Sequence, residues 1–247
     1  MIQVTLIRIE GYGPWTLTLG SDREHALQML QAKLYSDIQM QFSKSNGLAF
    51  FNRFDEIFAI TNGISIEQHR EILDTIRSSY DELDITMAIG RGKTPYQAHL
   101  DAYNARNNSN GKVIESSSKF EDGYVQIMHV DVDHFTSKIS SRLSPYEISA
   151  LIFDLYAKLA YAFMDHQALT FFLGGDNFMI PSNGISKDEA LMIIDKVSKE
   201  LNIELKCGIG KAKTAREAAS MATNALDTIR DMRDEGRIEK VYELSCL

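Results

Sequence analysis

Three aspartates in the second half of the chain have the residue type and spacing of a metal site. In the segment VQIMHVDVDHFT, strand alternation puts His129, Asp131 and Asp133 on one face and the apolar residues between them on the other. A further aspartate, Asp176, follows two glycines in FFLGGDNFMIPSNG. Carboxylates within about 4 to 6 Å of one another cannot all stay ionised unless a positive charge joins them. A hard divalent cation, Mg²⁺ or Mn²⁺, is the usual partner of such oxygen ligands.

The stretch Gly174-Gly175-Asp176 also fits a plain hairpin turn, and taken alone that is the commoner interpretation. The neighbouring strand changes the balance. In a split β-α-β unit the first strand pairs antiparallel with the third, so the end of the first strand lies beside the turn that opens the third. We therefore expect Asp131 and Asp176 to meet at one edge of a sheet, where the glycines leave room for a ligand.

Two copies of one unit make up the chain. The segment FFNRFDEIFAITNGIS, which begins at Phe50, matches FFLGGDNFMIPSNGIS, which begins at Phe171, without a gap. The segment MAIGRGKTPYQA, from Met87, matches CGIGKAKTAREA, from Cys207, in the same way. A repeat of about 120 residues is longer than a single supersecondary motif, so each copy is predicted to be a domain.

Each copy is predicted to be an α+β domain of the ferredoxin-like, palm type. Apolar periodicity gives the order strand, helix, strand, tight turn, strand, helix, strand (βαββαβ), and an extra helix follows. We expect antiparallel sheets with helices on one face, which leaves the other face open for a site or a second copy. The polar stretch 107–122, rich in Asn and Ser, is the predicted linker. The predicted domains are therefore 1–116 and 123–247.

Helix starts recur at matching places in the two copies. Six helices are predicted to begin at capping boxes, in which Ser or Thr is followed three residues later by Glu or Gln. The capping residues are Ser21, Ser65 and Thr94 in the first copy and Ser144, Ser186 and Thr214 in the second. The matching starts support the division into two copies.

Weaker signals concern two lysines and a histidine. The segments GRGKT and GKAKT each end a predicted strand and open a predicted helix, where free amides favour an anion, although neither has the spacing of a Walker P-loop. Lys213, and less strongly Lys211, is a predicted phosphate contact, and a solvated loop lysine is an equally good interpretation. His129 shares the face of Asp131 and is a candidate proton carrier, with a hydrogen-bonded structural histidine as the alternative.

The composition argues against several classes of protein. The 247 residues include 44% hydrophobic and 24% charged residues, which is ordinary for globular domains. No apolar run approaches the roughly 20 residues needed to cross a bilayer, so we expect a cytoplasmic protein with no membrane partner. The formal net charge of -8 argues against nucleic acid as a partner. The 2 cysteines, at no metal-like spacing, indicate neither a disulfide framework nor a zinc site.

Several motifs together resemble a known family. The segments HVDVDHF, GGDNF and GIGKAKTAREAASMATNALDTIR are similar to the GGDEF and palm-type nucleotidyl cyclase superfamily. With GYGPWT, RFDEIFAITNG and the tandem copies, nearly the whole chain resembles the archaeal GTP cyclohydrolase III family. This resemblance implies Mg²⁺-dependent hydrolysis of GTP with opening of the imidazole ring, giving 2-amino-5-formylamino-6-(5-phosphoribosylamino)pyrimidin-4(3H)-one and two phosphates. It also implies a homo-oligomer, dimer or tetramer, and a monovalent cation as a further candidate cofactor.

The resemblance assigns roles to residues of the second copy. It implies that Asp131 and Asp176 bind the metal, with the Val132 carbonyl and Asp133 as further ligands. Asp131, Asp176 and His129 are the predicted catalytic residues, and the water that attacks C8 of guanine is activated either at the metal or by a side chain such as His129. The predicted substrate contacts are Phe135, Thr136, Gly174, Gly175, Asn177, Lys213 and Asp55.

The first copy departs from the pattern of the second. Arg8 stands where the second copy has Asp131, and Arg53-Phe54 replace the glycine pair, although Asp55 still matches Asp176. We predict that the first copy is a degenerate half-site, in which Asp55 is still able to bind a cation or a guanine edge.

The second copy departs from the diguanylate cyclases at Asn177, where their motif has an acidic residue. The missing acid argues against cyclase chemistry. A nucleotidyl cyclase of the diguanylate or adenylate type is one alternative function, and a non-catalytic GTP-binding regulator is another.

Overall fold

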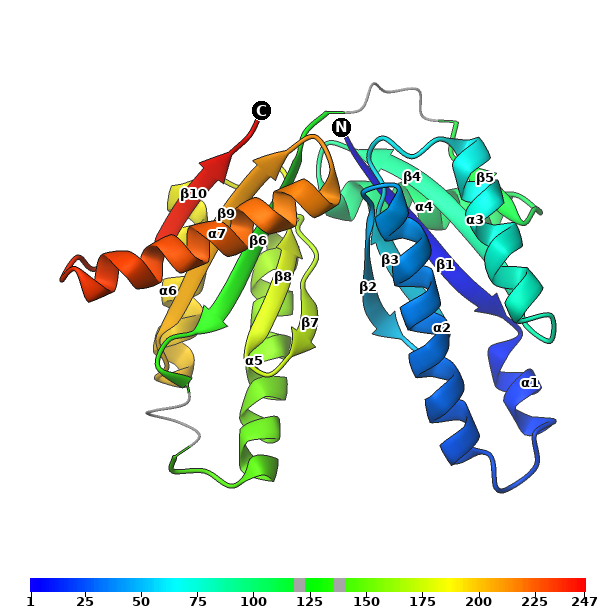
Figure 1. Cartoon of the computed structure of the whole chain (residues 1–247), viewed down its shortest axis with the longest axis horizontal. Helices are drawn as coiled ribbons and strands as arrows, with labels where there is room; N and C mark the ends of the chain where they lie inside the picture. The colour runs from blue at the N-terminus through cyan, green and yellow to red at the C-terminus, as the bar shows by residue number, and fades with distance from the viewer. Residues whose placement is uncertain (118–122, 136–140) are drawn as a thin grey trace. The chain divides into compact units, whose positions relative to one another are not determined.

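The computed structural model of the chain describes residues 1–117, 123–135 and 141–247. The chain divides into two compact units, and each has one sheet with helices packed on it (Figure 1). Unit 1 covers Met1–Gly92 and Gln97–Asp122, and unit 2 covers Lys93–Tyr96 and Gly123–Leu247.

The elements follow the predicted order in both copies. The first copy contains β1 (Ile2–Glu10), α1 (Tyr12–Leu17), α2 (Glu24–Lys44), β2 (Leu48–Arg53), β3 (Glu56–Ile60), α3 (Ile66–Ser79), β4 (Asp84–Gly92), α4 (Pro95–Asn108) and β5 (Val113–Glu115). The second contains β6 (Val125–Val132), α5 (Pro145–Asp165), β7 (Phe171–Gly174), β8 (Asn177–Pro181), α6 (Lys187–Leu201), β9 (Leu205–Ala212), α7 (Ala215–Asp234) and β10 (Val241–Ser245). The short helix α1 and the strands β5 and β10 are additions to that order.

The two sheets have the same topology. The strand order is β2-β3-β1-β4-β5 in unit 1 and β7-β8-β6-β9-β10 in unit 2. Four strands of each sheet pair antiparallel, and the fifth pairs parallel with its neighbour, β5 with β4 and β10 with β9. The predicted α+β, ferredoxin-like fold is confirmed, and the fifth strands make both sheets mixed. In unit 1 this strand comes from the predicted linker, because Val113 and Ile114 add apolar side chains to the sheet edge.

Helices cover both faces of the sheet in unit 2, so the expectation of one open face is wrong. The helices α5 and α6 pack on one face, and α7 lies across the other (Figure 1). Glycine makes this close approach possible: a Cβ at Gly208 would lie 2.0 Å from the carbonyl oxygen of Ala222. The same contact exists in unit 1, where a Cβ at Gly90 would lie 2.2 Å from the Ala102 nitrogen of α4. The extra helix of each copy therefore packs against a strand whose glycines allow the two backbones to come into direct contact.

Side-chain caps fix the starts of four predicted helices, one of them α7, where the Thr214 hydroxyl accepts a hydrogen bond from the Glu217 amide. Ser65, Ser144 and Ser186 each form the reciprocal capping box, in which the serine and the residue three positions later satisfy each other's backbone amides. The prediction at Ser21 is wrong. This residue lies in the bend after α1, and α2 begins at Glu24 without a side-chain cap.

A buried clamp holds the loop after the third strand in both units. In unit 1 the Gln3 side chain donates to the carbonyl oxygen of Thr61 at 2.8 Å and to its hydroxyl at 3.1 Å. In unit 2 Gln126 makes the same two contacts with Ser182, at 3.0 and 3.2 Å. The clamp gives a structural reason why Asn-Gly-Ile-Ser recurs after these residues in both copies, as part of the shared frame.

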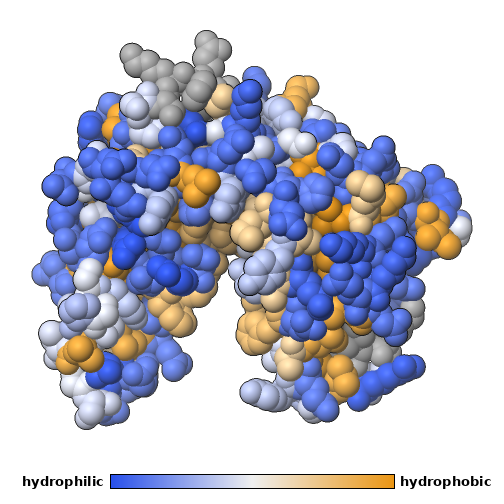
Figure 2. Space-filling view, turned by 180° about the vertical axis from the view of Figure 1, so that it is seen from behind, coloured by the Kyte–Doolittle hydropathy of each residue, from blue (hydrophilic) through white to orange (hydrophobic). Residues whose placement is uncertain are grey.

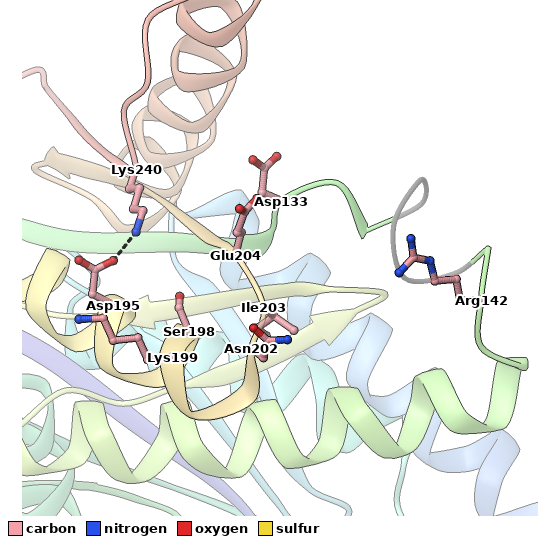
Figure 3. A pocket seen from close by; sticks show the side chains of 9 residues that line it. All are labelled: Asp133, Arg142, Asp195, Ser198, Lys199, Asn202, Ile203, Glu204 and Lys240. Atoms are coloured by element: carbon pink, nitrogen blue, oxygen red, sulfur yellow. Dashed lines mark hydrogen bonds and ion pairs between the residues drawn. The ribbon is translucent and has the colours of Figure 1, made fainter.

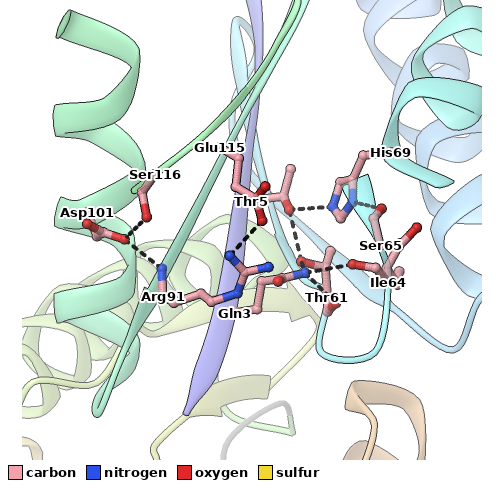
Figure 4. A network of polar contacts seen from close by, with 10 residues as sticks. All are labelled: Gln3, Thr5, Thr61, Ile64, Ser65, His69, Arg91, Asp101, Glu115 and Ser116. Carbon is pink, nitrogen blue, oxygen red and sulfur yellow. Dashed lines mark hydrogen bonds and ion pairs between the residues drawn. The ribbon is translucent and has the colours of Figure 1, made fainter. Parts of the chain in front are cut away.

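Unit 1 extends this clamp into a larger polar network (Figure 4). The Thr5 hydroxyl lies 2.9 Å from the Thr61 hydroxyl and 2.8 Å from Nε2 of His69, which is fully buried. Burial lowers the pKa of His69 below its ordinary value. Unit 2 has Met128 and Ala190 at the positions of Thr5 and His69, so this part of the network belongs to unit 1.

Polar side chains cover most of the surface that Figure 2 displays, and apolar side chains form small patches on it. Tyr146, Tyr161 and Ile238 are among the large apolar residues that are exposed. Within the described part of the chain, every helix is too short or too polar to span a bilayer.

Candidate functional site

A pocket of about 430 Å³ lies at the end of β6 in unit 2 and gathers five of the predicted site residues. The turn between β7 and β8, the start of β9 and the last turns of α7 form the rest of its wall. The predicted residues that line it are Asp131, Val132, Asp133, Phe135 and Asp176. Lys206, Arg230 and Arg233 also line it, and none of these three was predicted from the sequence.

Asp131 lies near the end of β6 on the face that α7 covers. The alternation of β6 sends Met128 and Val130 into the core against α5 and α6, and Asp131 toward the opposite face, as predicted. Its side chain is 8% exposed, and its Oδ2 accepts a hydrogen bond from Arg230 at 2.5 Å. Its Oδ1 is buried and has no hydrogen-bond partner among the described residues. A buried carboxylate oxygen without a donor is able to accept a cation or a substrate donor.

Asp176 lies in the tight turn between β7 and β8. Gly174 and Gly175 have φ values of 113° and 61°, a region that strongly favours glycine, so the turn requires the glycine pair. The Asp176 carboxylate accepts a hydrogen bond from the Val132 amide. Burial raises the pKa of Asp176 above its ordinary value, and the charge of Asp131 raises it further. The two carboxylates therefore lie within electrostatic reach of each other, at the edge where we expected them to meet.

Asp133 is held by cations from two elements. Its Oδ1 lies 2.9 Å from Lys206 Nζ of β9 and 3.0 Å from Arg233 Nη1 of α7. Burial acts to raise the pKa of Asp133, but the hydrogen bond and charge of Lys206, with the charges of His134 and Arg233, hold that pKa below its ordinary value. Asp133 is therefore a charged carboxylate whose Oδ1 is already engaged by the protein.

The cations of the pocket change the charge argument made from the sequence. Three aspartates face Lys206, Arg230 and Arg233, so protein cations already compensate much of the negative charge that pointed to a divalent cation. Lys206 was open to prediction, because it is the register partner of Asp131 on the neighbouring strand. The two arginines carried no such signal, since charges spaced i, i+3 on a helix usually form a solvated face.

His129 does not line this pocket and connects to it through Asn177. Its Nδ1 lies 3.1 Å from the Thr223 hydroxyl of α7, and its Nε2 lies 2.9 Å from Asn177 Oδ1. The Asn177 amide then donates to Asp176 Oδ1 at 3.2 Å. Both ring nitrogens of His129 are therefore engaged, and the histidine orients the amide beside Asp176.

Lys213 is not brought to the pocket. It precedes α7, whereas Arg230 lies near the other end of that helix. At a rise of about 1.5 Å per residue, the helix separates the two residues by about 25 Å. The neighbouring candidate Lys211 forms an ion pair of 2.8 Å with Glu243.

The remaining predicted contacts have different places. Gly174, Gly175 and Asn177 flank Asp176 in its hairpin. Asp55 belongs to unit 1, where it forms an ion pair of 3.2 Å with Arg53. Thr136 lies outside the described residues.

A second cavity, of about 470 Å³, shares Asp133 with the first pocket (Figure 3). The end of α6 lines it, and an ion pair of 2.6 Å joins Lys240 to Asp195 on its wall. Ligand atoms of Asp133, His134 and Glu204 lie within 4.8 Å of one another, and within the described residues they form a candidate metal group. Asp133 thus lies between two polar cavities.

In unit 1 the residue equivalent to Asp131 is the cation Arg8. Arg8 lies 3.6 Å from Glu10 and 3.6 Å from Glu56, counting closest nitrogen and oxygen atoms. Arg106 of α4 forms a second ion pair with Glu56, at 2.8 Å, and both side chains are nearly buried. The first copy therefore replaces the acidic pocket with a cluster in which the central charge is positive.

Comparison with known proteins identifies the family. A family model described as GTP cyclohydrolase III matches residues 2–242. The chain belongs to the GTP cyclohydrolase III family. Relatives of the same name include one from Methanothermobacter thermautotrophicus, 40% identical over 237 residues that cover 93% of this chain and 95% of that protein. Another, from Methanocaldococcus jannaschii, is 40% identical over 238 residues that cover 93% of this chain and 88% of that protein.

The family membership makes the chain an enzyme, a GTP cyclohydrolase. Solved structures with similarity to it include an EAL/GGDEF domain protein from M. capsulatus, with a TM-score of 0.39, 18% identity, and coverage of 51% of this chain and 89% of that chain. A bacterial light-regulated adenylyl cyclase has a TM-score of 0.38 and 13% identity, and the match covers 94% of this chain and 83% of that chain.

Proposed function

We propose that this member of the GTP cyclohydrolase III family hydrolyses GTP with opening of the imidazole ring. The product is 2-amino-5-formylamino-6-(5-phosphoribosylamino)pyrimidin-4(3H)-one, and two phosphates are released. Water adds at C8 of guanine and the formyl group stays on the product, while further water molecules cleave the triphosphate. The observation that carries the proposal is the buried, unpartnered Oδ1 of Asp131 beside Asp176 in a chain of this family.

We propose Mg²⁺ as the cofactor, held by Asp131 and Asp176 with the Val132 carbonyl. The donor set consists of oxygen atoms, which suits a hard cation, and Asp131 Oδ1 lacks a protein donor among the described residues. Asp133 stays a predicted further ligand through Oδ2, because Lys206 and Arg233 engage its Oδ1. When bound, the ion neutralises triphosphate charge and activates water. The monovalent cation stays a prediction without proposed ligands.

The arginines of the pocket are proposed to bind the triphosphate of GTP. Arg230 and Arg233 are 45% and 37% exposed, so their guanidinium groups are accessible to a ligand. Guanidinium groups bind phosphate oxygens through two parallel hydrogen bonds. We infer that Arg230 exchanges its contact with Asp131 for the triphosphate of GTP when the substrate binds. This exchange frees the carboxylate as the substrate binds.

We assign His129 a positioning role. It holds the Asn177 oxygen at 2.9 Å, and the Asn177 amide group donates to Asp176, so the histidine fixes the orientation of the catalytic carboxylate. The expected effect of His129→Asn, whose shorter amide replaces only Nδ1, is a moderate fall in kcat with little change in KM. Partial recovery of the activity in His129→Gln, whose amide takes the place of Nε2 beside Asn177, would support positioning over proton transfer.

A spectroscopic assay tests the reaction. GTP and Mg²⁺ added to the protein should lose the purine ultraviolet band while orthophosphate appears. A nucleotidyl cyclase would keep the purine spectrum and release pyrophosphate, and a non-catalytic regulator would change neither. An unaltered spectrum after long incubation contradicts the proposal. Asp176→Asn should abolish turnover and keep the fold, since a turn side chain contributes little to stability.

We also propose a homo-oligomer, a dimer or tetramer, with the domains 1–116 and 123–247 in each chain. Exposed apolar side chains on α5 support it, among them Tyr146 and Tyr161, which are 86% and 69% exposed. Light scattering after size exclusion should give a mass of two or four chains. A single-chain mass at every concentration contradicts the oligomer.

A further inference from the structure

A large pocket in unit 1 has aromatic walls. It lies between α1, α2 and the hairpin of β2 and β3, and its volume is about 670 Å³, within the usual range of about 300 to 1,000 Å³ for small-molecule sites. Four rings line it, those of Tyr12, Tyr35, Phe51 and Phe54. The Phe51 ring lies edge-on to both Tyr35 and Phe54, with centroid distances of 5.6 and 5.1 Å. The rings present flat apolar surface to whatever enters.

The second copy carries a larger side chain, the exposed Phe153, at the corresponding place on its helix. The helices α2 and α5 have equal length and the same order of buried positions, which aligns Gln31 with Ile152 and Ala32 with Phe153. In unit 2 the Phe153 ring lies 6.2 Å from Phe172 and occupies this part of the surface. In unit 1 the methyl group of Ala32 leaves the space open. The small side chain of Ala32 thus keeps this side of the pocket open in the first copy.

Polar groups line one side of the pocket in unit 1. Gln31 is 8% exposed at a position where the other copy has a buried isoleucine, and its amide donates to the Tyr12 hydroxyl at 2.5 Å. Gln28 and Glu24 line the same side and are exposed. A buried amide on an otherwise apolar helix face needs a hydrogen-bond partner, and Tyr12 supplies it, so the Gln31–Tyr12 pair forms a polar edge beside the aromatic rings.

We propose that this pocket binds the purine base of a nucleotide. A purine has flat faces that stack on aromatic rings and a polar edge that pairs with amides and carboxylates, which matches the aromatic wall and the Gln31 side of the pocket. The turn residue Phe54 then has a role of its own: where unit 2 needs glycine beside its carboxylates, unit 1 uses the same turn to close a base pocket. This inference deepens the proposed function, on which it rests, by adding a base site in the first copy.

Trp15 reports directly on this pocket. It is the chain's 1 tryptophan, and its ring centroid lies 5.9 Å from that of Tyr12. Titration with guanosine in the absence of Mg²⁺ should give a saturable change in tryptophan fluorescence, since guanosine carries the base and no phosphate. Adenosine and ribose serve as further probes, and ribose should give no change.

Two variants and a control make the test specific. Ala32→Phe copies the residue that unit 2 tolerates at this position, so it should fill the pocket, keep the fold and abolish the guanosine response. Phe54→Ala should weaken binding about tenfold, which is the usual contribution of stacking between a base and an aromatic ring. Met29→Ala changes a side chain that is 71% exposed on the same helix and does not line the pocket, and it should bind as the wild type does.

The source of the base is decided by kinetics. If occupancy of the pocket is coupled to turnover, Ala32→Phe raises KM for GTP. If a separate nucleotide binds there, KM stays unchanged and the guanosine response alone is lost. Either result supports the base site and names its ligand.

The base site and the proposed reaction fail separately. Asp131→Asn should lose GTP turnover and keep the guanosine response, because Asp131 lies in the other unit's pocket. Absence of any saturable fluorescence change with guanosine and adenosine in the wild type, or an unchanged response in Ala32→Phe, overturns the base site while leaving the reaction intact.

Discussion

The two copies carry opposite charges at equivalent positions of their two sheets. In unit 2 an aspartate ends the first strand and the surrounding elements supply Lys206, Arg230 and Arg233. In unit 1 the equivalent residue is Arg8, and its neighbours are Glu10 and Glu56. A divalent cation would be attracted by an unpartnered carboxylate oxygen and repelled by a guanidinium group at the same distance. The backbone therefore provides a shared frame, and under the proposed function this one charge would decide which copy binds metal.

The turns of the two copies differ for a related reason. Unit 2 has glycines at positive φ beside Asp176, whereas unit 1 has Arg53 and Phe54 in that turn, and neither adopts positive φ. The glycine turn of unit 2 leaves room for a ligand beside the carboxylate. In unit 1 the phenylalanine of the same turn forms part of a pocket wall. After duplication the two halves kept their shared clamp and changed their turns, which separates the residues that hold the frame from those that serve a site.

The largest expected effect comes from changing Asp131, the proposed metal ligand of unit 2. Asp131→Asn should lower kcat roughly a thousandfold, because an amide is a poor replacement for an ionised ligand. The matched change Asp55→Asn in unit 1 should alter kcat less than about threefold. Steady-state release of phosphate measures both, and circular dichroism checks the fold. Equal losses in the two variants contradict a division of labour between the copies.

The next prediction concerns the part that both copies share. Gly208→Ala and Gly90→Ala should each lower the free energy of unfolding by roughly 3 kcal/mol, since the new methyl group would overlap the backbone of α7 or α4. Gly13→Ala, where a Cβ meets nothing within 4 Å, should change it by less than about 0.5 kcal/mol. Urea unfolding gives the three values. A mild effect at one glycine and a severe one at the other would mean that the two helix contacts are not equivalent.

A smaller effect distinguishes an arginine that binds substrate from an arginine that stabilises the fold. Arg230→Met should raise KM for GTP about tenfold, because a charge-assisted contact to phosphate is lost. Arg106→Met should leave KM unchanged and lower the free energy of unfolding by about 2 kcal/mol, because Glu56 loses its closest partner in a nearly buried pair. Kinetics and urea unfolding together test the pair. A rise in KM for Arg106→Met would show that the first copy also contacts the triphosphate.

The smallest effect lies in the pH dependence of stability. Burial lowers the pKa of His69 in the folded chain below the value of about 6.5 that an unfolded histidine has. The stability that the neutral His69 network contributes is therefore fully present above about pH 6.5 and is lost as the pH falls below it. The loss has a limiting slope of about 1.4 kcal/mol per pH unit for one proton. His69→Gln should remove this component in urea unfolding between pH 7.5 and 5.

If the variant and the wild type lose stability in parallel as the pH falls, His69 is not the responsible group. Ala190 of unit 2 occupies the equivalent helix position, so this component should belong to the first copy alone.

The sequence predicted the parts of the molecule that depend on local pattern. The duplication, the hairpin at Asp176 and the alternation of β6 all follow from short-range rules of periodicity and turn chemistry, and each agrees with the structure. Strand β5 was missed, because three residues within a polar stretch carry too little periodicity to indicate a strand. The packing of α7 on β9 was missed as well. Neither the alanines of the helix nor the glycines of the strand indicate which element they contact.

The site was predictable only as far as strand pairing reaches. Asp131 and Asp176 were paired correctly from topology, and the same reasoning would have added Lys206. Arg230 and Arg233 depend on where the end of α7 lies, which is a tertiary property. Lys213 shows a limit of local reasoning: a lysine at a helix start resembles a phosphate contact, and the length of α7 places it away from the Asp131 pocket.

The glycine contact between α7 and β9 has a consequence for motion. Most of α7 is anchored by buried side chains, from Ala218 and Ala222 to Ile229, whereas the last turn beyond Ile229 is joined to the rest of the unit through the ion pair of Arg233. Amide hydrogen exchange should therefore be slow in the first half and fast near Arg233. Fraying of that last turn would withdraw the Arg233 guanidinium group from Asp133 without unfolding the sheet, and under the proposed function it would open the pocket for release of product.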